Sequence, residues 1–219
     1  PMLETLKQQV LEANLQLPKL NLVAFTWGNV SAIDRESGIV VIKPSGVTYD
    51  AMRAEDMVCV ELASGKVVEG TLKPSSDTPT HLVLYREFAV AGGSPVRGVI
   101  HTHSTHAVAW AQGLRDVPLF GTTHADHVQK DIPCTPYLSR EAVERDYETE
   151  TGNLIVRSFR ERKLNPAEMS MVLVGGHGPF AWGSSAEKAV YNGAVLEEIA
   201  RMAYLTLQIN PRAKGLPSY

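Results

Sequence analysis

Two histidines in the middle of the sequence are spaced as metal ligands on one face of a β-strand would be. Residues 98–103 read GVIHTH, and the β-branched residues among them favour an extended conformation. Because side chains alternate between the two faces of a strand, His101 and His103 would point the same way. Zinc takes three or four such ligands, with nitrogen about 2.0–2.1 Å away. The pair therefore makes half of a metal site, although two ordinary half-buried histidines would give the same pattern.

A third histidine, His177, lies between two glycines directly after a strand predicted at residues 171–174. Glycines remove side-chain bulk and permit unusual backbone angles, as close approach to a ligand requires. With His101 and His103 it would complete a set of three imidazoles that leaves one coordination position open, which is typical of catalytic zinc. A simple Gly-His-Gly turn is the alternative interpretation.

Three short segments combine hydroxyls, glycines and lysines at predicted turns, which favours an anionic ligand. They are residues 27–29 (WGN), 43–46 (KPSG) and 73–78 (KPSSDT). The last precedes a predicted helix, where backbone N–H groups and hydroxyls make a phosphate site. Ser76 or Asp77 as an ordinary helix N-cap is the alternative.

A fourth segment, residues 121–127, places Asp126 among hydroxyls and imidazoles. A carboxylate in such surroundings is a candidate general acid or base. An exposed polar loop would have the same composition, and the residues alone leave both interpretations open.

Periodic patterns in the rest of the chain predict the elements that must position these residues. Apolar spacing predicts helices over residues 3–17, closed by Pro18, over 78–91, and over 139–162, the last of them long and exposed. A capping box at residues 184–187 opens a final helix that runs to about residue 209. Runs 22–34 with 39–43, and 57–62 with 67–69, predict hairpins. Helices mixed with hairpins predict an α+β fold with a mainly antiparallel sheet.

The composition excludes several other classes of protein. The 219 residues carry a formal net charge of −3, which argues against electrostatic binding to nucleic acid. No apolar run approaches the ~20 residues of a membrane span, and no secretion signal is predicted at the N-terminus. Cys59 and Cys134 are too few for a disulfide framework, which favours unreactive thiols in a reducing cytoplasm. No linker or repeat divides the sequence, so we expect one domain over residues 1–219.

Six motifs, in this order, resemble the class II aldolase/adducin-head family, and most of all its L-ribulose-5-phosphate 4-epimerases. They are residues 27–31 (WGNVS), 43–47 (KPSGV), 73–78 (KPSSDT), 101–103 (HTH), 121–126 (GTTHAD) and 177–183 (HGPFAWG). The resemblance runs from about residue 2 to residue 209. It implies a three-layer α/β/α domain around the antiparallel sheet.

The resemblance also implies roles for individual residues. One Zn²⁺ per subunit would be bound by His101, His103 and His177, with Asp77 as a fourth ligand or close neighbour. The substrate phosphate would be held by Gly28, Asn29, Lys43, Ser45, Gly46, Ser75 and Ser76. Asp126 would be a catalytic acid or base, contributed across a subunit boundary of a four-fold symmetric homotetramer.

The implied reaction interconverts L-ribulose 5-phosphate and D-xylulose 5-phosphate. The hydrogen on C4 is not next to the carbonyl, so its direct removal is chemically hard. Retro-aldol cleavage of the C3–C4 bond, with zinc as a Lewis acid, followed by re-addition to the other face of the aldehyde avoids this step. The chain would then be a cytoplasmic isomerase of pentose phosphate metabolism. A class II sugar-phosphate aldolase that releases its fragments and a non-catalytic adducin-head domain are the alternatives.

Two features depart from the family pattern. Residues 91–97 form a longer stretch than usual, which predicts a change in a loop only. Family members continue into a tail that carries a histidine and a catalytic tyrosine, whereas this sequence ends at Tyr219, outside any matching motif. We therefore expect the natural chain to continue and its tail to close over the site. The second proton donor is left unassigned.

Overall fold

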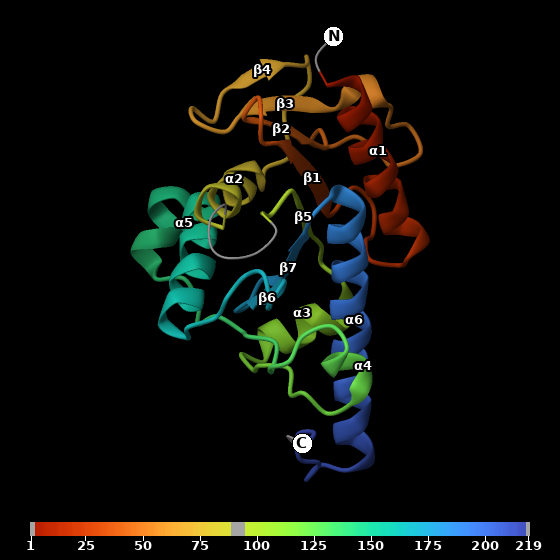
Figure 1. The fold of residues 1–219 in the computed structure, drawn as a ribbon, viewed down its shortest axis with the longest axis vertical. Coiled ribbons are helices and arrows are strands. Elements are labelled where there is room, and N and C mark those ends of the chain that lie inside the picture. Colours follow the sequence, from red (N-terminus) through yellow and green to blue (C-terminus); the bar gives the residue numbers. More distant parts are fainter. Residues whose placement is uncertain (1–2, 89–94, 218–219) are drawn as a thin grey trace.

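The computed structural model describes residues 3–88 and 95–217. Its centre is a sheet of seven strands in the order β4-β3-β2-β1-β5-β7-β6 (Figure 1). The strands are β1 (Asn29–Asp34), β2 (Ile39–Ile42), β3 (Val58–Glu61), β4 (Val67–Glu69), β5 (Gly98–His101), β6 (Met171–Val174) and β7 (Gly178–Gly183). Neighbouring strands in this described sheet run antiparallel throughout. The predicted α+β class with a mainly antiparallel sheet is confirmed.

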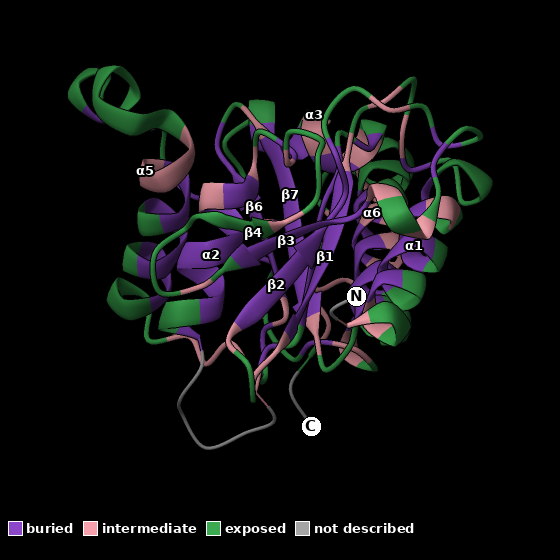
Figure 2. Ribbon diagram, turned by 90° about the horizontal axis from the view of Figure 1, so that it is seen from above, coloured by how far each residue is buried: buried purple, intermediate pink, exposed green. Residues whose placement is uncertain are grey.

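Helices cover both faces of the sheet (Figure 2). On one face lie α2 (Thr78–Glu87) and α5 (Arg140–Glu161), which pack against each other. On the other lie α1 (Glu4–Lys19), α3 (Thr105–Gln112) and α6 (Ala186–Ile209). Two short elements, the 3-10 helix η1 (Ala54–Asp56) and α4 (Thr122–Ala125), lie in the connections. The three-layer arrangement implied by the resemblance is confirmed.

Coverage on both faces explains why strands such as β2 and β6 are apolar at every position rather than at every second one. The residues of β2 (IVVI) and β6 (MVLV) are all buried. Large side chains such as Trp182, Phe159 and Ile100 are at most 1% exposed between the layers. Burying one such side chain contributes about 1.5–3 kcal/mol, so the core provides a rigid frame for the strand ends.

The first strand and the first helix differ in extent from their predictions. The strand begins at Asn29 rather than at residue 22, because Phe25 and Gly28 adopt left-handed backbone angles, with φ of 54° and 81°. Such angles interrupt an extended chain. The first helix runs through Pro18 and ends at Lys19.

The prediction of a long helix at residues 139–162 is correct in extent but wrong in exposure. Asp146, with φ −167° and ψ 87°, kinks α5, and the part beyond the kink is largely buried. A Cβ atom added at Gly152 would lie 2.7 Å from Cβ of Val83 in α2. This close approach, which the charges of α5 mask in the sequence, explains the burial.

Some expectations concern residues outside the described ranges. The end of the helix predicted to reach residue 91, most of the stretch 91–97, and Tyr219 belong to this group. Within the ranges that the structure describes, none of the helices combines the length and apolarity that a bilayer span requires.

Candidate active site

Strand β5 and the turn between β6 and β7 bring three histidines together at one end of the sheet. His101 is the last residue of β5, His103 lies just beyond it, and His177 immediately precedes β7. One ligand atom of each residue lies within 4.8 Å of the others, and Nε2 of His101 is 3.1 Å from Nε2 of His103. Three nitrogen donors therefore converge on one point.

Neighbouring groups hold two of these imidazoles. Nδ1 of His101 lies 2.8 Å from the carbonyl oxygen of Pro179, which only accepts, so this nitrogen carries the proton and Nε2 keeps its lone pair. Nδ1 of His177 lies 3.1 Å from the hydroxyl of Tyr147. Burial lowers the pKa of His101 and lowers that of His177 to about 3. Neutral imidazoles whose outer nitrogen is hydrogen-bonded are the usual metal-binding form of histidine.

Asp77 places a carboxylate beside these rings. It occupies the N-cap position of α2 but makes no capping hydrogen bond with its side chain. Its Oδ2 accepts instead from Nδ2 of Asn29 at 2.8 Å and lies 4.0 Å from Nε2 of His101. Although burial alone would raise the pKa of Asp77, the nearby His101 and the Asn29 hydrogen bond lower it overall. The Asp77 side chain therefore faces Asn29 and His101 rather than capping the helix.

These residues fit a divalent metal ion. Nε2 of His101 and Nε2 of His103 lie 3.1 Å apart, close enough for one cation to accept a lone pair from each. Three imidazoles with a carboxylate nearby form a donor set that zinc takes readily, and imidazole also suits other first-row metals.

A cavity of about 300 Å³ opens beside the histidines. Two segments meet at its far side, because Pro44 and Pro74 form a β-bridge, Ser45 N donates to the carbonyl oxygen of Lys73, and Ser75 N donates to that of Lys43. The residues that line the cavity include the predicted anion-binding and metal-binding residues Gly28, Asn29, Lys43, Ser45, Gly46, Ser75, Ser76, Asp77, His103 and His177. The structure thus gathers residues from distant parts of the sequence around one space.

Lys43 supplies a cation at this cavity. Its side chain is 1% exposed, and Nζ donates to the carbonyl oxygen of Thr26 at 3.1 Å. Burial lowers the pKa of Lys43 to about 8. A bound anion would stabilise the charged form and offset part of this burial.

Two glycines at the site are required by geometry. Gly28 has a φ of 81°, and a Cβ atom there would lie 2.5 Å from Cγ1 of Val23. Gly176, just before His177, has a φ of 70°, and its Cβ would lie 2.6 Å from the ring of Tyr137. Other residues would be strained in both places.

Asp126 lies away from this cavity. It follows α4 on the surface and is not among the residues that line the cavity. The structure of a single chain therefore does not bring Asp126 to the cavity.

Two cavity residues, Tyr147 and Glu148, were missed by the sequence patterns. The kink at Asp146 turns them toward the histidines, and Thr80 Oγ1 donates to the carbonyl oxygen of Glu148 at 2.6 Å. The signal in the sequence is one aromatic residue in a charged stretch (RDYETE), which does not distinguish a site residue from an exposed one.

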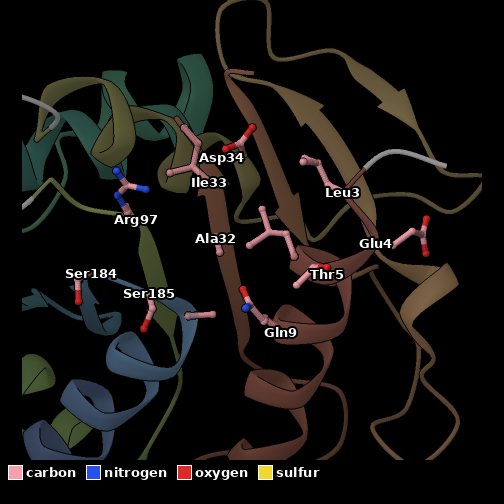
Figure 3. A pocket seen from close by; sticks show the side chains of 12 residues that line it. Leu3, Glu4, Thr5, Gln9, Ala32, Ile33, Asp34, Arg97, Ser184 and Ser185 are labelled. Atoms are coloured by element: carbon pink, nitrogen blue, oxygen red, sulfur yellow. The ribbon is translucent and has the colours of Figure 1, made fainter. Parts of the chain in front are cut away.

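A larger hollow of about 540 Å³ lies at the opposite end of β1 (Figure 3). It is formed where the start of α1, the end of β1 and the start of α6 meet, and its polar residues include Asp34, Arg97 and Ser185. The described residues that line it include no histidine and no cysteine.

The sequence matches the model of a known family. The family described as "Class II Aldolase and Adducin N-terminal domain" matches over residues 8–204. The chain belongs to this family. The predicted resemblance to this family is confirmed, and membership of it suggests a carbohydrate-processing enzyme.

Solved structures share the fold of this class II aldolase family chain. An L-fuculose 1-phosphate aldolase has a TM-score of 0.78 and 24% identity, over 98% of this chain and 91% of its own. YgbL of Klebsiella pneumoniae, described as "a putative aldolase/epimerase/decarboxylase", has a TM-score of 0.74 and 24% identity, over 100% of this chain and 97% of its own. The L-fuculose-1-phosphate aldolase of Thermus thermophilus has a TM-score of 0.68 and 23% identity, over 96% of this chain and 98% of its own. At these identities the likeness shows the fold.

Proposed function

We propose that this chain is a zinc-dependent enzyme that breaks and re-forms the C3–C4 bond of a phosphorylated ketose, interconverting L-ribulose 5-phosphate and D-xylulose 5-phosphate. One observation carries the proposal. Three imidazoles converge, two of them at the wall of a cavity of about 300 Å³, and glycines, hydroxyls and the Lys43 ammonium line the same cavity. A sugar phosphate has both the anion and the carbonyl that these two sides would bind.

In this proposal His101, His103 and His177 hold the metal, and Asp77 is a fourth ligand or a close neighbour. The phosphate is bound by the glycines, hydroxyls and cation of the opposite side, namely Gly28, Asn29, Lys43, Ser45, Gly46, Ser75 and Ser76. Backbone N–H groups at the start of α2 add partial positive charge there.

The chemistry requires the phosphate and the carbonyl to be held together. A base removes the proton of the C4 hydroxyl, the C3–C4 bond breaks, and its electron pair moves toward the C2 carbonyl. A metal held by the histidines would supply Lewis acidity for the negative charge on that oxygen. The aldehyde fragment keeps the phosphate, so the anion-binding side prevents its loss while the aldehyde turns its other face. The bond then re-forms, and the alkoxide at C4 recovers a proton.

Proton transfer would involve residues from two subunits. Asp126 is the proposed acid or base, and since it lies outside the cavity of its own chain, we propose a homotetramer with sites between adjacent subunits. Tyr147, whose pKa is raised by burial, stays protonated and holds Nδ1 of His177.

The second candidate is a class II sugar-phosphate aldolase that releases its two fragments. The structural similarity to an L-fuculose 1-phosphate aldolase favours it, and the same metal and phosphate groups would serve both reactions. The two differ in whether the aldehyde fragment leaves before the bond re-forms.

One assay separates these reactions. The protein is incubated with Zn²⁺ and its bound metal is measured. L-ribulose 5-phosphate is then added, and D-xylulose 5-phosphate, dihydroxyacetone and glycolaldehyde phosphate are quantified by NMR. We expect xylulose 5-phosphate without accumulation of fragments. Stoichiometric fragments would support the aldolase, and no turnover together with no bound metal would support a non-catalytic adducin-head domain.

A further inference from the structure

A row of polar side chains, all but Asp77 buried, runs from Tyr85 in the interior to Asp77 at the cavity. The hydroxyls of Tyr85 and Ser31 are 2.7 Å apart, and Ser31 Oγ lies 2.7 Å from Nδ1 of His81. Nε2 of His81 lies 2.6 Å from Oδ1 of Asn29, whose Nδ2 donates to Asp77. Tyr85, Ser31 and His81 are 0% exposed. We call these five residues the buried polar network.

The direction of every hydrogen bond in the network follows from its Asp77 end. A carboxylate only accepts, so the amide nitrogen of Asn29 faces Asp77 and the amide oxygen faces His81. That oxygen only accepts, so Nε2 of His81 carries a proton. Burial lowers the pKa of His81 to about 3, so the ring is neutral and Nδ1 has a lone pair. Nδ1 accepts from Ser31, which in turn accepts from Tyr85.

We infer that His81 is a positioning residue for the anion-binding side of the site, because its Nε2–H donates to the amide oxygen of Asn29 and holds the amide in the orientation that also satisfies Asp77. The inference rests on the proposed function, in which Asn29 contacts the substrate phosphate. An asparagine amide can rotate by 180° and exchange its nitrogen and oxygen. His81 and Asp77 together disfavour the rotated form, which would place two donors against each other on one side and two acceptors on the other.

The orientation matters because the amide nitrogen of Asn29 faces the Asp77 carboxylate and, in the proposed function, the substrate phosphate, which are both negatively charged. The amide nitrogen carries two hydrogens, of which one is donated to Asp77, and Asn29 also lines the cavity. The second hydrogen remains for a phosphate oxygen. In the rotated form the amide oxygen would face the carboxylate and repel it.

Another buried histidine shows that this connectivity is not general. His124 is 4% exposed, and its Nε2 lies 2.9 Å from the carbonyl oxygen of Lys130, whereas its Nδ1 has no hydrogen-bond partner among the described residues. In His81 both ring nitrogens are hydrogen-bonded. Nε2 donates to Asn29 at the cavity, and Nδ1 accepts from Ser31, which holds the ring in place.

Two substitutions of the same length isolate the hydrogen bond. His81→Gln keeps an N–H donor near the position of Nε2, whereas His81→Met has a similar shape and no donor. Each variant is loaded with zinc, and the Kd for inorganic phosphate is measured by calorimetry. Outer partners of ligating groups typically contribute about 10–100-fold, so we expect His81→Met to raise the phosphate Kd by that factor and His81→Gln to restore most of it. Equal values for the two variants would overturn the inference.

A third variant and a spectrum of the unmodified protein separate positioning from packing. Tyr85→Phe removes the hydrogen bond at the far end of the network but leaves the His81–Asn29 bond, so its phosphate Kd should stay within about 3-fold of the unmodified value. A Kd raised as much as in His81→Met would contradict the positioning role. Nitrogen-15 NMR of the unmodified protein should show a neutral His81 protonated at Nε2, and protonation at Nδ1 would overturn the assignment. Neither readout requires the enzyme to be an epimerase.

Discussion

Strand β1 has a hollow at each end, and the smaller one is lined by most of the candidate site residues. At the Asn29 end the cavity measures about 300 Å³, and at the Asp34 end about 540 Å³. Volume alone would favour the Asp34 end. The buried polar side chains favour the other, because Asn29, Lys43 and His101 are at most 2% exposed there.

The polar groups at the Asp34 end serve the fold locally. Asp34 accepts from the backbone N–H of Ser37 at 3.0 Å within the β1–β2 turn. Ser185 accepts from the backbone N–H of Lys188 and so caps α6. At the Asn29 end, by contrast, Asp77 leaves its helix uncapped and turns toward His101. Because burying polar groups is costly, those that give up a local structural role are the better sign of function.

The largest effect that the comparison predicts is loss of the metal. His103→Ala removes one of three imidazoles, so zinc affinity should fall more than about 100-fold and turnover with it. Metal content after dialysis, measured by elemental analysis, tests this. Ser184→Ala at the Asp34 end is the matched control and should keep one zinc per chain and the full rate. Full zinc occupancy in His103→Ala would contradict a metal site at the Asn29 end of β1.

The next largest effect concerns Asp126, which lies at neither end. Asp126→Asn keeps the shape but removes the proton acceptor, so turnover should fall about 10²–10⁴-fold while zinc stays bound. Turnover and metal content are measured on the same sample. A near-normal rate would make Asp126 an ordinary surface residue.

Mixing the two inactive variants tests where Asp126 acts. If each site uses the histidines of one subunit and Asp126 of its neighbour, tetramers re-formed from His103→Ala and Asp126→Asn chains contain some intact sites. The mixture should regain part of the rate, whereas each variant re-formed alone should not. No recovery in verified mixed tetramers would contradict the shared site.

The sequence predicted the parts of the site that depend on local periodicity. Strand alternation predicted that His101 and His103 lie together; they do, although β5 ends at His101 and His103 lies just beyond it. The glycines around His177 indicated a tight turn, which the φ of Gly176 confirms. The segments around Ser45 and Ser75 were identified separately, and the structure joins them by a β-bridge.

What the sequence did not predict depends on contacts between distant residues. Tyr147 reaches the cavity because of a kink in α5, and the charged pattern of that helix conceals it. The burial of His81 depends on the packing of α2 over β1, so nothing near it in the sequence marks it as different from a surface histidine. The first strand was predicted too long because the left-handed angle at Phe25 has no sequence signal.

A moderate effect is predicted for Lys43, whose titration should make kcat/KM depend on pH. Its pKa of about 8 means that the lysine is charged below pH 8 and loses its proton as the pH rises, while a phosphate monoester, with a pKa near 6, stays doubly charged. We therefore expect kcat/KM to decline above pH 8. Lys43→Arg should shift this decline to higher pH, and Lys43→Met should abolish it.

The size of the Lys43 effect follows from the hydrogen bond that it would make to the substrate phosphate. A hydrogen bond to a charged group contributes about 1.5–3 kcal/mol, so Lys43→Met should raise KM by about 10- to 100-fold with a smaller change in kcat. An unchanged KM in Lys43→Met would show that the lysine only fills space at the cavity wall.

The smallest effect is predicted for the Asp34 end. Ser185→Ala removes the cap of α6, which should lower the free energy of unfolding by about 1 kcal/mol. For a chain of this size that corresponds to about 2–4 °C in Tm, measured at one fixed chain concentration because assembly also affects Tm. Both kcat and KM should stay unchanged, since Ser185 lies in the larger hollow, away from the histidines. A change in KM without a change in Tm would mean that the larger hollow takes part in substrate binding, and the distinction between the two ends of β1 would fail.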